Sequence, residues 1–164
     1  MRRASGFCLA LLAVAGCGAF EPKPLDLGPG QHVVLGRIDL AGFEVTEGIV
    51  DIVREDQTFS QEVRTGFGAR EFAVALPPGR YRVARLRGGK DTLGTPNQVV
   101  WELGLAFEVG AEPATYVGTL RIGGSFGRTL RLTVVDELED TLRVLRTQYS
   151  NLPDTAVRAL MAPA

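Results

Sequence analysis

The sequence predicts a mainly β protein: an antiparallel β-sandwich of about seven or eight strands, followed by a C-terminal amphipathic helix. Three observations support this. Apolar and polar residues alternate with a period of two over much of residues 31–135, short turn-like segments separate the alternating stretches, and a helical period begins only after residue 135. Strands so close together in the chain favour a sandwich or barrel over a parallel sheet.

The first half of the alternating region contains five expected strands. They cover residues 32–40, 48–55 and 58–66 (a hairpin around Asp56-Gln57), 70–76, and 80–87 after the turn "PPG". In the last of these, Tyr81 and Val83 share one face and Arg80 and Arg82 the other. The alternation slips at Ala84-Arg85, which predicts a bulge or the end of the strand there.

The second half contains three more expected strands and the helix. Residues 99–109 carry an apolar side chain at every odd position, and Trp101, one of these, is expected to be buried. Residues 115–122 and 128–135 form a predicted hairpin around "GGSFG".

The predicted helix begins at Asp136, which forms a capping-box pattern with Glu139. Its apolar stripe is Leu138, Leu142, Leu145 and Tyr149, and Arg143 and Arg146 suit the C-terminal end of the helix dipole. Asp154 is expected to cap a last short turn with Val157, Leu160 and Met161. We expect the stripe to pack on a sheet; contact with a membrane or partner is the alternative.

The N-terminus has the features of a secretory signal. Arg2 and Arg3 precede a short apolar stretch that is about half the roughly 20 residues needed to span a bilayer. The following "VAGC", residues 14–17, resembles the bacterial lipobox. The resemblance implies cleavage between Gly16 and Cys17, a diacylglyceryl group on Cys17, and a lipid-anchored protein of the cell envelope. Gly18 rather than Asp follows, which in this family is typical of the outer membrane, facing the periplasm, rather than the inner membrane.

These features divide the chain into four expected segments. They are a cleaved signal peptide (1–16), the lipidated cysteine with a flexible, Pro- and Gly-containing tether (17–30), the sandwich (31–135) and a C-terminal helical segment (136–164). Cleavage would leave 164 − 16 = 148 residues, enough for one domain. Losing Arg2 and Arg3 leaves 16 basic and 19 acidic residues, a net charge of −3, so no nucleic-acid partner is expected. With Cys8 removed and Cys17 acylated, no thiol remains for a disulfide.

The stretches "LPPGRYRV" and "YVGTLRI", followed by a C-terminal helix, resemble small secreted bacterial β-sandwich domains of the prealbumin-like or carboxypeptidase-regulatory-like type. The likeness covers residues 31–135. It implies a seven- or eight-stranded antiparallel sandwich and carries no catalytic residues over to this chain.

Candidate catalytic and metal-binding residues are few. "GGSFG" matches the G-x-S-x-G elbow around Ser125, but it lies between two expected strands, and the only histidine is far upstream. That histidine, His32, lacks cysteine partners for zinc, although Asp39 or Glu44 could join it. The "GGKDT" stretch fails the phosphate-loop pattern, because Ala84 stands at the first glycine position. No metal, cofactor or catalytic site is therefore expected.

Two groups of charged residues remain. Asp136, Glu137, Glu139 and Asp140 are crowded as in a glycosidase pair, but one helix start explains them. The row Arg80, Arg82, Arg85 and Arg87 is the best candidate for binding an anionic glycan or lipid headgroup, the alternative being a solvated strand face. We therefore expect a non-enzymatic binding or accessory module for an envelope protein or polymer; the alternative is an envelope glycan-binding or glycan-hydrolysing protein.

Overall fold

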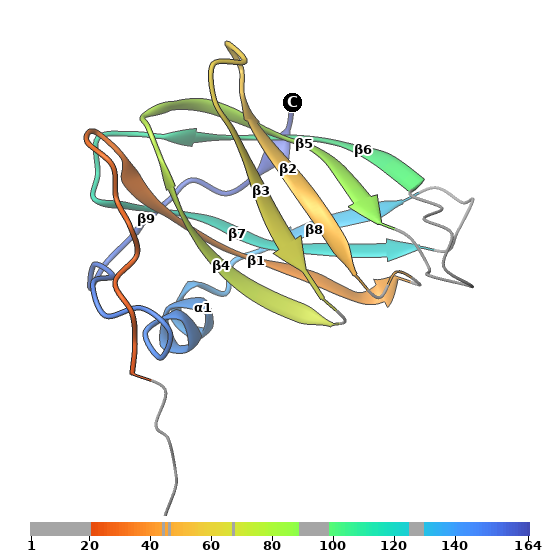
Figure 1. Ribbon diagram of the computed structural model, residues 1–164. Helices are drawn as coiled ribbons and strands as arrows, with labels where there is room; N and C mark the ends of the chain where they lie inside the picture. Colours follow the sequence, from red (N-terminus) through yellow and green to blue (C-terminus); the bar gives the residue numbers. More distant parts are fainter. Residues whose placement is uncertain (1–20, 44, 46, 67, 89–98, 125–129) are drawn as a thin grey trace, which may run out of the picture.

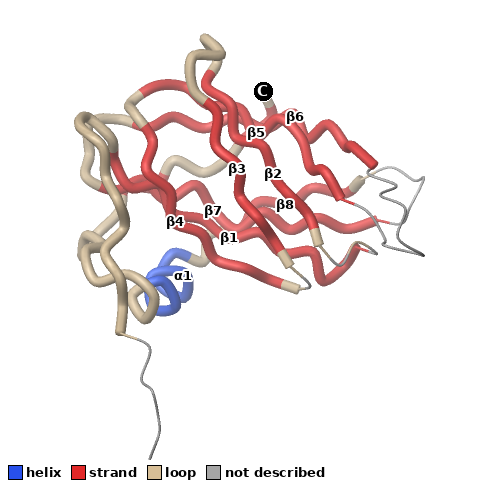
Figure 2. Tube along the Cα trace, viewed as in Figure 1, coloured by secondary structure: helices blue, strands red, loops and turns tan. Residues whose placement is uncertain are grey.

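The computed structural model describes residues 21–43, 45, 47–66, 68–88, 99–124 and 130–164. Ten strands and one helix follow one another in these residues (Figure 2). They are β1 (His32–Phe43), β2 (Gly48–Arg54), β3 (Ser60–Thr65), β4 (Ala69–Leu76), β5 (Gly79–Gly88), β6 (Val99–Val109), β7 (Ala114–Gly124), β8 (Arg131–Val135), α1 (Leu138–Leu145), β9 (Val157–Arg158) and β10 (Ala162–Pro163). The predicted mainly β class is confirmed.

The strands form two five-stranded sheets that pack as a sandwich (Figure 1). Sheet one has the order β4-β1-β7-β8, with β9 beside β8 along the free edge of β7; sheet two has the order β10-β6-β5-β2-β3. Sheet one is mixed rather than purely antiparallel, because β7 runs parallel to its neighbour β1 and also to β9. Neither parallel pair is a hairpin, so local turn signals could not reveal them.

The predicted hairpins and the predicted bulge are confirmed. β2 and β3 pair around a turn in which Gln57 adopts a φ of 58°, and β7 pairs with β8. In β5 the pairing with β6 and with β2 shifts between Val83 and Arg85, which leaves Ala84 as the extra residue. At the start of β5, the Tyr81 hydroxyl donates a 2.7 Å hydrogen bond to the Pro77 carbonyl and braces the preceding turn.

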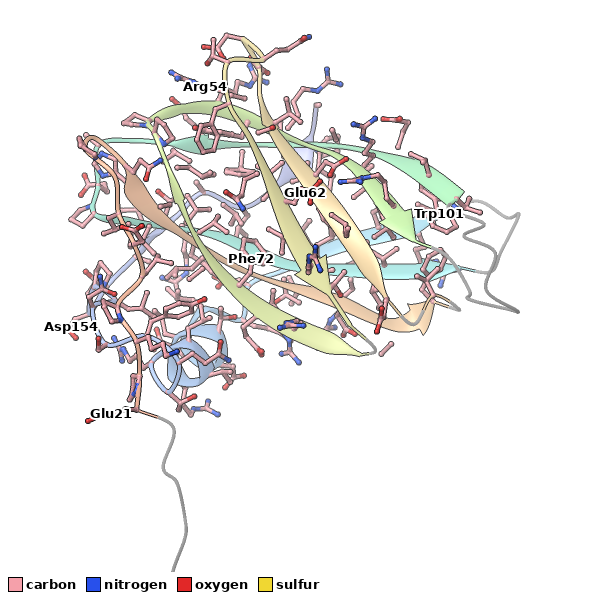
Figure 3. The ribbon with its side chains drawn as sticks, viewed as in Figure 1. Glu21, Arg54, Glu62, Phe72, Trp101 and Asp154 are labelled. Atoms are coloured by element: carbon pink, nitrogen blue, oxygen red, sulfur yellow. The ribbon has the colours of Figure 1, made fainter. Side chains whose placement is uncertain are left out.

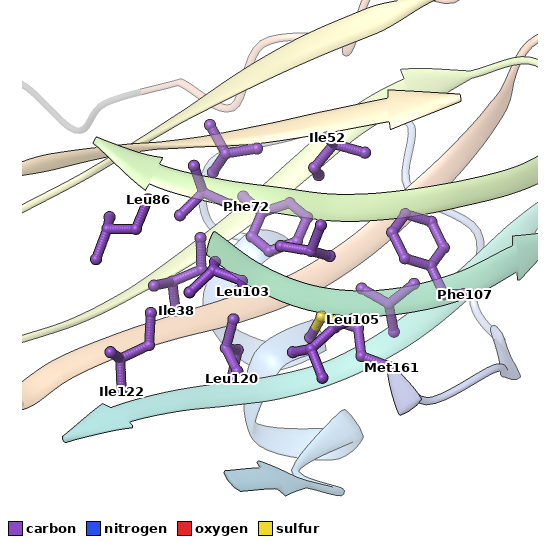
Figure 4. Close-up of a cluster of buried hydrophobic side chains, with 14 of the residues drawn as sticks. Ile38, Ile52, Phe72, Leu86, Leu103, Leu105, Phe107, Leu120, Ile122 and Met161 are labelled. Carbon is purple, nitrogen blue, oxygen red and sulfur yellow. The ribbon is translucent and has the colours of Figure 1, made fainter. Parts of the chain in front are cut away.

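The main core lies between the two sheets (Figure 4). The inward residues of every long strand except β8 contribute buried apolar side chains, among them Ile38, Ile52, Phe72, Leu86, Leu103, Phe107, Leu120 and Ile122. Trp101 is half-buried rather than enclosed, and its ring meets Phe43 edge-on at a centroid distance of 5.0 Å. The odd-position alternation of β6 therefore predicted the buried face, but not the partial exposure near its beginning.

A second apolar cluster lies on the opposite face of sheet one, under α1. Leu138, Leu142 and Leu145 pack there on Val33, Leu35, Ala73, Ala114 and Tyr116. The helix stripe therefore packs on a sheet, as predicted. The helix is shorter than its stripe, since it ends at Leu145 and Tyr149 lies in a β-bridge with Lys23. The expected capping box is wrong: the N-cap is Glu137, whose side chain makes no capping bond, while Asp136 accepts a bond from the Leu138 amide.

The C-terminal segment joins the two sheets instead of forming the expected short helical turn. Val157–Arg158 pairs with β7 of sheet one, and Ala162–Pro163 pairs with β6 of sheet two. Between them the amide of Met161 donates to the Val117 carbonyl, and its side chain is buried in the main core. The unpaired edges of β7 and β6 offer these residues backbone partners that a helical turn would leave unused. Proline is tolerated in β10 because the strand lies at a sheet edge.

Part of the expected flexible tether is bound to the domain. The Lys23 amide donates to the Gln148 carbonyl (3.0 Å), and the Ser150 amide donates to the Lys23 carbonyl (3.1 Å). Leu25 packs against the second apolar cluster. Residues 17–20, including Cys17, lie outside the described part of the chain. Within that part, no helix has the length and apolar character that crossing a bilayer requires.

Candidate binding surface

The bulge at Ala84 places the four arginines of β5 on one face of sheet two. Tyr81 and Val83 point into the core before the bulge, and Leu86 points into it afterwards. Without the extra residue, strict alternation would send Arg85 and Arg87 inward. The sequence therefore identified the slip, and the structure shows its consequence: a single outward row of Arg80, Arg82, Arg85 and Arg87.

Asp51 of β2 lies beside Arg85 and Arg87, the last two arginines of this row, and is 6% exposed. Its Oδ2 accepts a 2.6 Å hydrogen bond from Arg85 Nε, and its Oδ1 accepts a 2.6 Å bond from an Arg87 terminal nitrogen. Arg87 Nε also lies 3.0 Å from Oδ2, so Arg87 is a two-point partner. Burial raises the pKa of the Asp51 carboxyl. The hydrogen bonds from Arg87 and Arg85 together lower it by more than burial raises it, so the pKa of Asp51 lies below its ordinary value.

The arginines of the row differ in their partners. Besides Asp51, Arg87 also bonds Glu62 of β3 at 2.5 Å. The hydrogen bonds to Asp51, and to a smaller extent the one to Glu62, raise the pKa of Arg87 above its ordinary value. Arg80 pairs with Glu55 at 3.1 Å, where both side chains are exposed. Arg82 is exposed and has no ion pair among the residues that the structure describes. Of the four predicted anion-binding residues, Arg82 is thus the one whose charge is least compensated.

The outer face of sheet two carries carboxylates on both sides of the arginine row. Across β3, β2, β5 and β6, the residues Glu62, Asp51, Arg85 and Glu102 stand in register, and Arg80 stands opposite Glu108. An anion that bound Arg85 or Arg87 would have to compete with carboxylates already at hydrogen-bond distance. This arrangement is that of a solvated, ion-paired sheet face, open to an added ligand chiefly at Arg82.

Sequence reasoning did not identify Asp51 as the partner of the arginines. A signal was present, because aspartate is uncommon inside strands and "GIVDIVR" places one among apolar residues. Its partners could not be found from sequence, since Arg85 and Arg87 come 34 and 36 residues later.

The crowded carboxylates at the start of α1 are also paired with arginines. Glu137 accepts hydrogen bonds from Arg37 of β1 (3.3 Å) and Arg121 of β7 (2.5 Å), and Asp136 bonds Arg158 of β9 at 2.7 Å. Asp140 pairs with Arg143 within the helix. These contacts fasten the helix start to three strands of sheet one, which is a structural use of the carboxylates.

The other candidate residues are not brought together in a site. His32 and Asp39 lie seven residues apart along the extended strand β1, where they pair with Leu76 and Ala69 of β4. This separation, about 23 Å, is too long for the two side chains to share a ligand. In the described part of the chain no group of three metal-ligating side chains is found. Glu44, Ser125, Gly16, Cys17 and most of "GGKDT" lie outside the residues that the structure describes.

Comparison with known proteins adds no assignment. No protein-family model matches the chain, and no curated protein or solved structure shows significant similarity to it.

Proposed function

We propose that this protein is a lipoprotein of the bacterial cell envelope, anchored through acyl chains on Cys17 in the outer rather than the inner membrane. The observation that carries the proposal is the succession of Arg2-Arg3, a short apolar run and Val14-Ala15-Gly16-Cys17. Each methylene buried in the bilayer contributes about 0.8 kcal/mol to the membrane-binding free energy, so two or three acyl chains attach the protein stably to the membrane. Gly18 after the cysteine supports the outer membrane, facing the periplasm.

The folded domain is compatible with this anchor. Its first described contacts with the C-terminal segment begin at Lys23, six positions after Cys17, so acylation requires nothing from the packed core. The α1 side is already covered, whereas the outer face of sheet two carries no layer of its own in the described chain (Figure 1). This supports a module that presents sheet two to an envelope partner.

We propose further that the module is non-enzymatic and acts in binding or as an accessory protein. The support is that the carboxylates most like a catalytic pair, Asp136 and Glu137, are engaged by arginines of sheet one. The alternative is binding of an anionic envelope glycan, which the exposed Arg82 favours. Crosslinking of the wild type and of Arg82→Glu to envelope components separates the two proposed functions, because binding of an anionic glycan should depend on the charge of Arg82. Arg131→Glu on β8 of sheet one is the matched charge reversal.

The anchor is tested by Cys17→Ala. We expect the wild-type protein to carry acyl chains on Cys17 by intact mass and to sediment with membranes. The variant should keep the far-ultraviolet spectrum of a β protein and appear in the soluble envelope fraction or as an uncut precursor, which the mass distinguishes. A wild-type mass with an unmodified Cys17, or a leaderless variant that still sediments with membranes, would overturn the proposal.

A further inference from the structure

The chain between the proposed anchor and β1 is attached to the opposite end of the sequence. Lys23 bridges Tyr149 through the backbone bonds of Lys23 with Gln148 and Ser150. Two residues on, the side chain of Asn151 replaces a backbone partner: its Oδ1 accepts from the Leu25 amide at 2.7 Å, and its Nδ2 donates to the Leu25 carbonyl at 2.9 Å. We call residues 23–25 and 148–151 the clip.

We infer that the clip orients the domain on the bilayer, with the α1 side toward the lipid surface and the β2–β3 turn away from it. This inference rests on the proposed lipid anchor at Cys17. The partner surface is a phospholipid bilayer, reached by a short covalent connection rather than by a binding pocket.

The length of chain outside the domain determines how far the anchor can reach. Six residues lead from Cys17 to Lys23, which span at most about 21 Å when fully extended. Without the clip, the chain would be free as far as β1, and the fifteen residues from Cys17 to His32 would span about 50 Å. The clip therefore shortens the maximal reach by more than half and restricts rotation of the domain against the membrane.

The exit point of the chain decides which side faces the bilayer. Glu21 lies at the α1 end of the molecule, and Arg54, beside the β2–β3 turn, lies at the far end (Figure 3). Leu25 packs with Tyr149 and Leu152 in the cluster under α1, so the exit point and the helix belong to one packed unit. A bilayer that holds Cys17 within reach of Lys23 must then lie on the α1 side.

Surface charge does not supply this orientation. The exposed charges of α1 and its C-cap are Glu139 and Asp140 against Arg143 and Arg146, which cancel. A balanced surface gains little from anionic headgroups. The orientation should therefore depend on the clip and should not change with salt concentration.

The test uses the acylated protein in phosphatidylethanolamine–phosphatidylglycerol vesicles that carry a headgroup energy acceptor. A donor dye is attached at Glu139→Cys on α1 or at Ser60→Cys beside the β2–β3 turn, both exposed positions. We expect severalfold higher transfer from position 139 than from position 60, and the same ratio at low and high salt. Asn151→Ala, which removes both side-chain bonds to Leu25 and keeps the backbone bonds of Lys23, should lower the ratio part of the way toward one. Gln148→Ala, which keeps every bond of the clip, should leave the ratio unchanged.

Hydrogen exchange on the same proteins gives a readout that does not need the membrane. The amides of Lys23, Leu25 and Ser150 should be protected in the wild type, and Asn151→Ala should remove the protection of Leu25. Unprotected amides, or equal transfer from both positions in a protein whose Cys17 is acylated, would overturn the orientation and leave the anchor intact. An unmodified Cys17 would overturn both the anchor and the orientation.

Discussion

Replacing Asp51 by asparagine tests whether its carboxylate organises the outer face of sheet two. Asparagine has the same shape but no charge, so Arg85 and Arg87 lose a buried counter-charge that accepts bonds from both. Removing one partner of a fully buried pair costs about 3–5 kcal/mol. Here the arginines reach solvent, Arg85 being 51% exposed, so we expect Asp51→Asn to lower the free energy of unfolding by about 1–3 kcal/mol at pH 7.

The pH dependence of the free energy of unfolding gives a second, independent test of the role of Asp51. The pKa of Asp51 in the folded protein lies below its ordinary value, so the stabilisation is fully present above the pKa of the unfolded state, near 4. It is lost as the pH falls through the lower pKa of the folded state. The difference in the free energy of unfolding between wild type and Asp51→Asn should therefore be largest near neutral pH and shrink steadily below about pH 4.

Urea unfolding followed by the fluorescence of Trp101, the single tryptophan, measures both quantities. Glu62→Gln is the matched control, because it removes a more exposed partner of Arg87 and should cost much less. A loss below about 0.5 kcal/mol at pH 7, within the range of an ordinary surface substitution, would refute the reasoning. So would a difference between the two proteins that stays constant as the pH is lowered.

Two further substitutions test the packing on either face of sheet one. Leu142→Ala should lower the free energy of unfolding, measured in urea, by about 2–5 kcal/mol, because the Leu142 side chain of α1 is buried against sheet one. The exposed Glu139→Ala should change it little, and similar losses from the two substitutions would contradict the role of α1. Gly36→Ala should cost about 1–3 kcal/mol, because its Cβ would lie 2.5 Å from the Phe72 ring, and Phe72→Leu should recover part of that loss. Additive effects of these last two substitutions in a double-mutant cycle would show that the ring contact is not the cause.

The sequence by itself determined the local features of this protein. A period of two predicted the strands, and the slip at Ala84-Arg85 predicted the bulge of β5, because both are written in consecutive side chains. The stripe of Leu138, Leu142 and Leu145 likewise predicted a helix packed on a sheet. The lipobox and its anchor remain predictions from residues 1–18.

Only the tertiary structure decided which segments meet. The parallel pairing of β1 with β7, the two arginines on Asp51 and the clip between Leu25 and Asn151 join residues 34 to 126 positions apart. Hydrogen bonds over such separations leave no periodic trace in either segment, because each backbone or charged group accepts many partners equally well. The choice among them is made by the burial of two sheet faces at once, and that is a property of the whole packed chain.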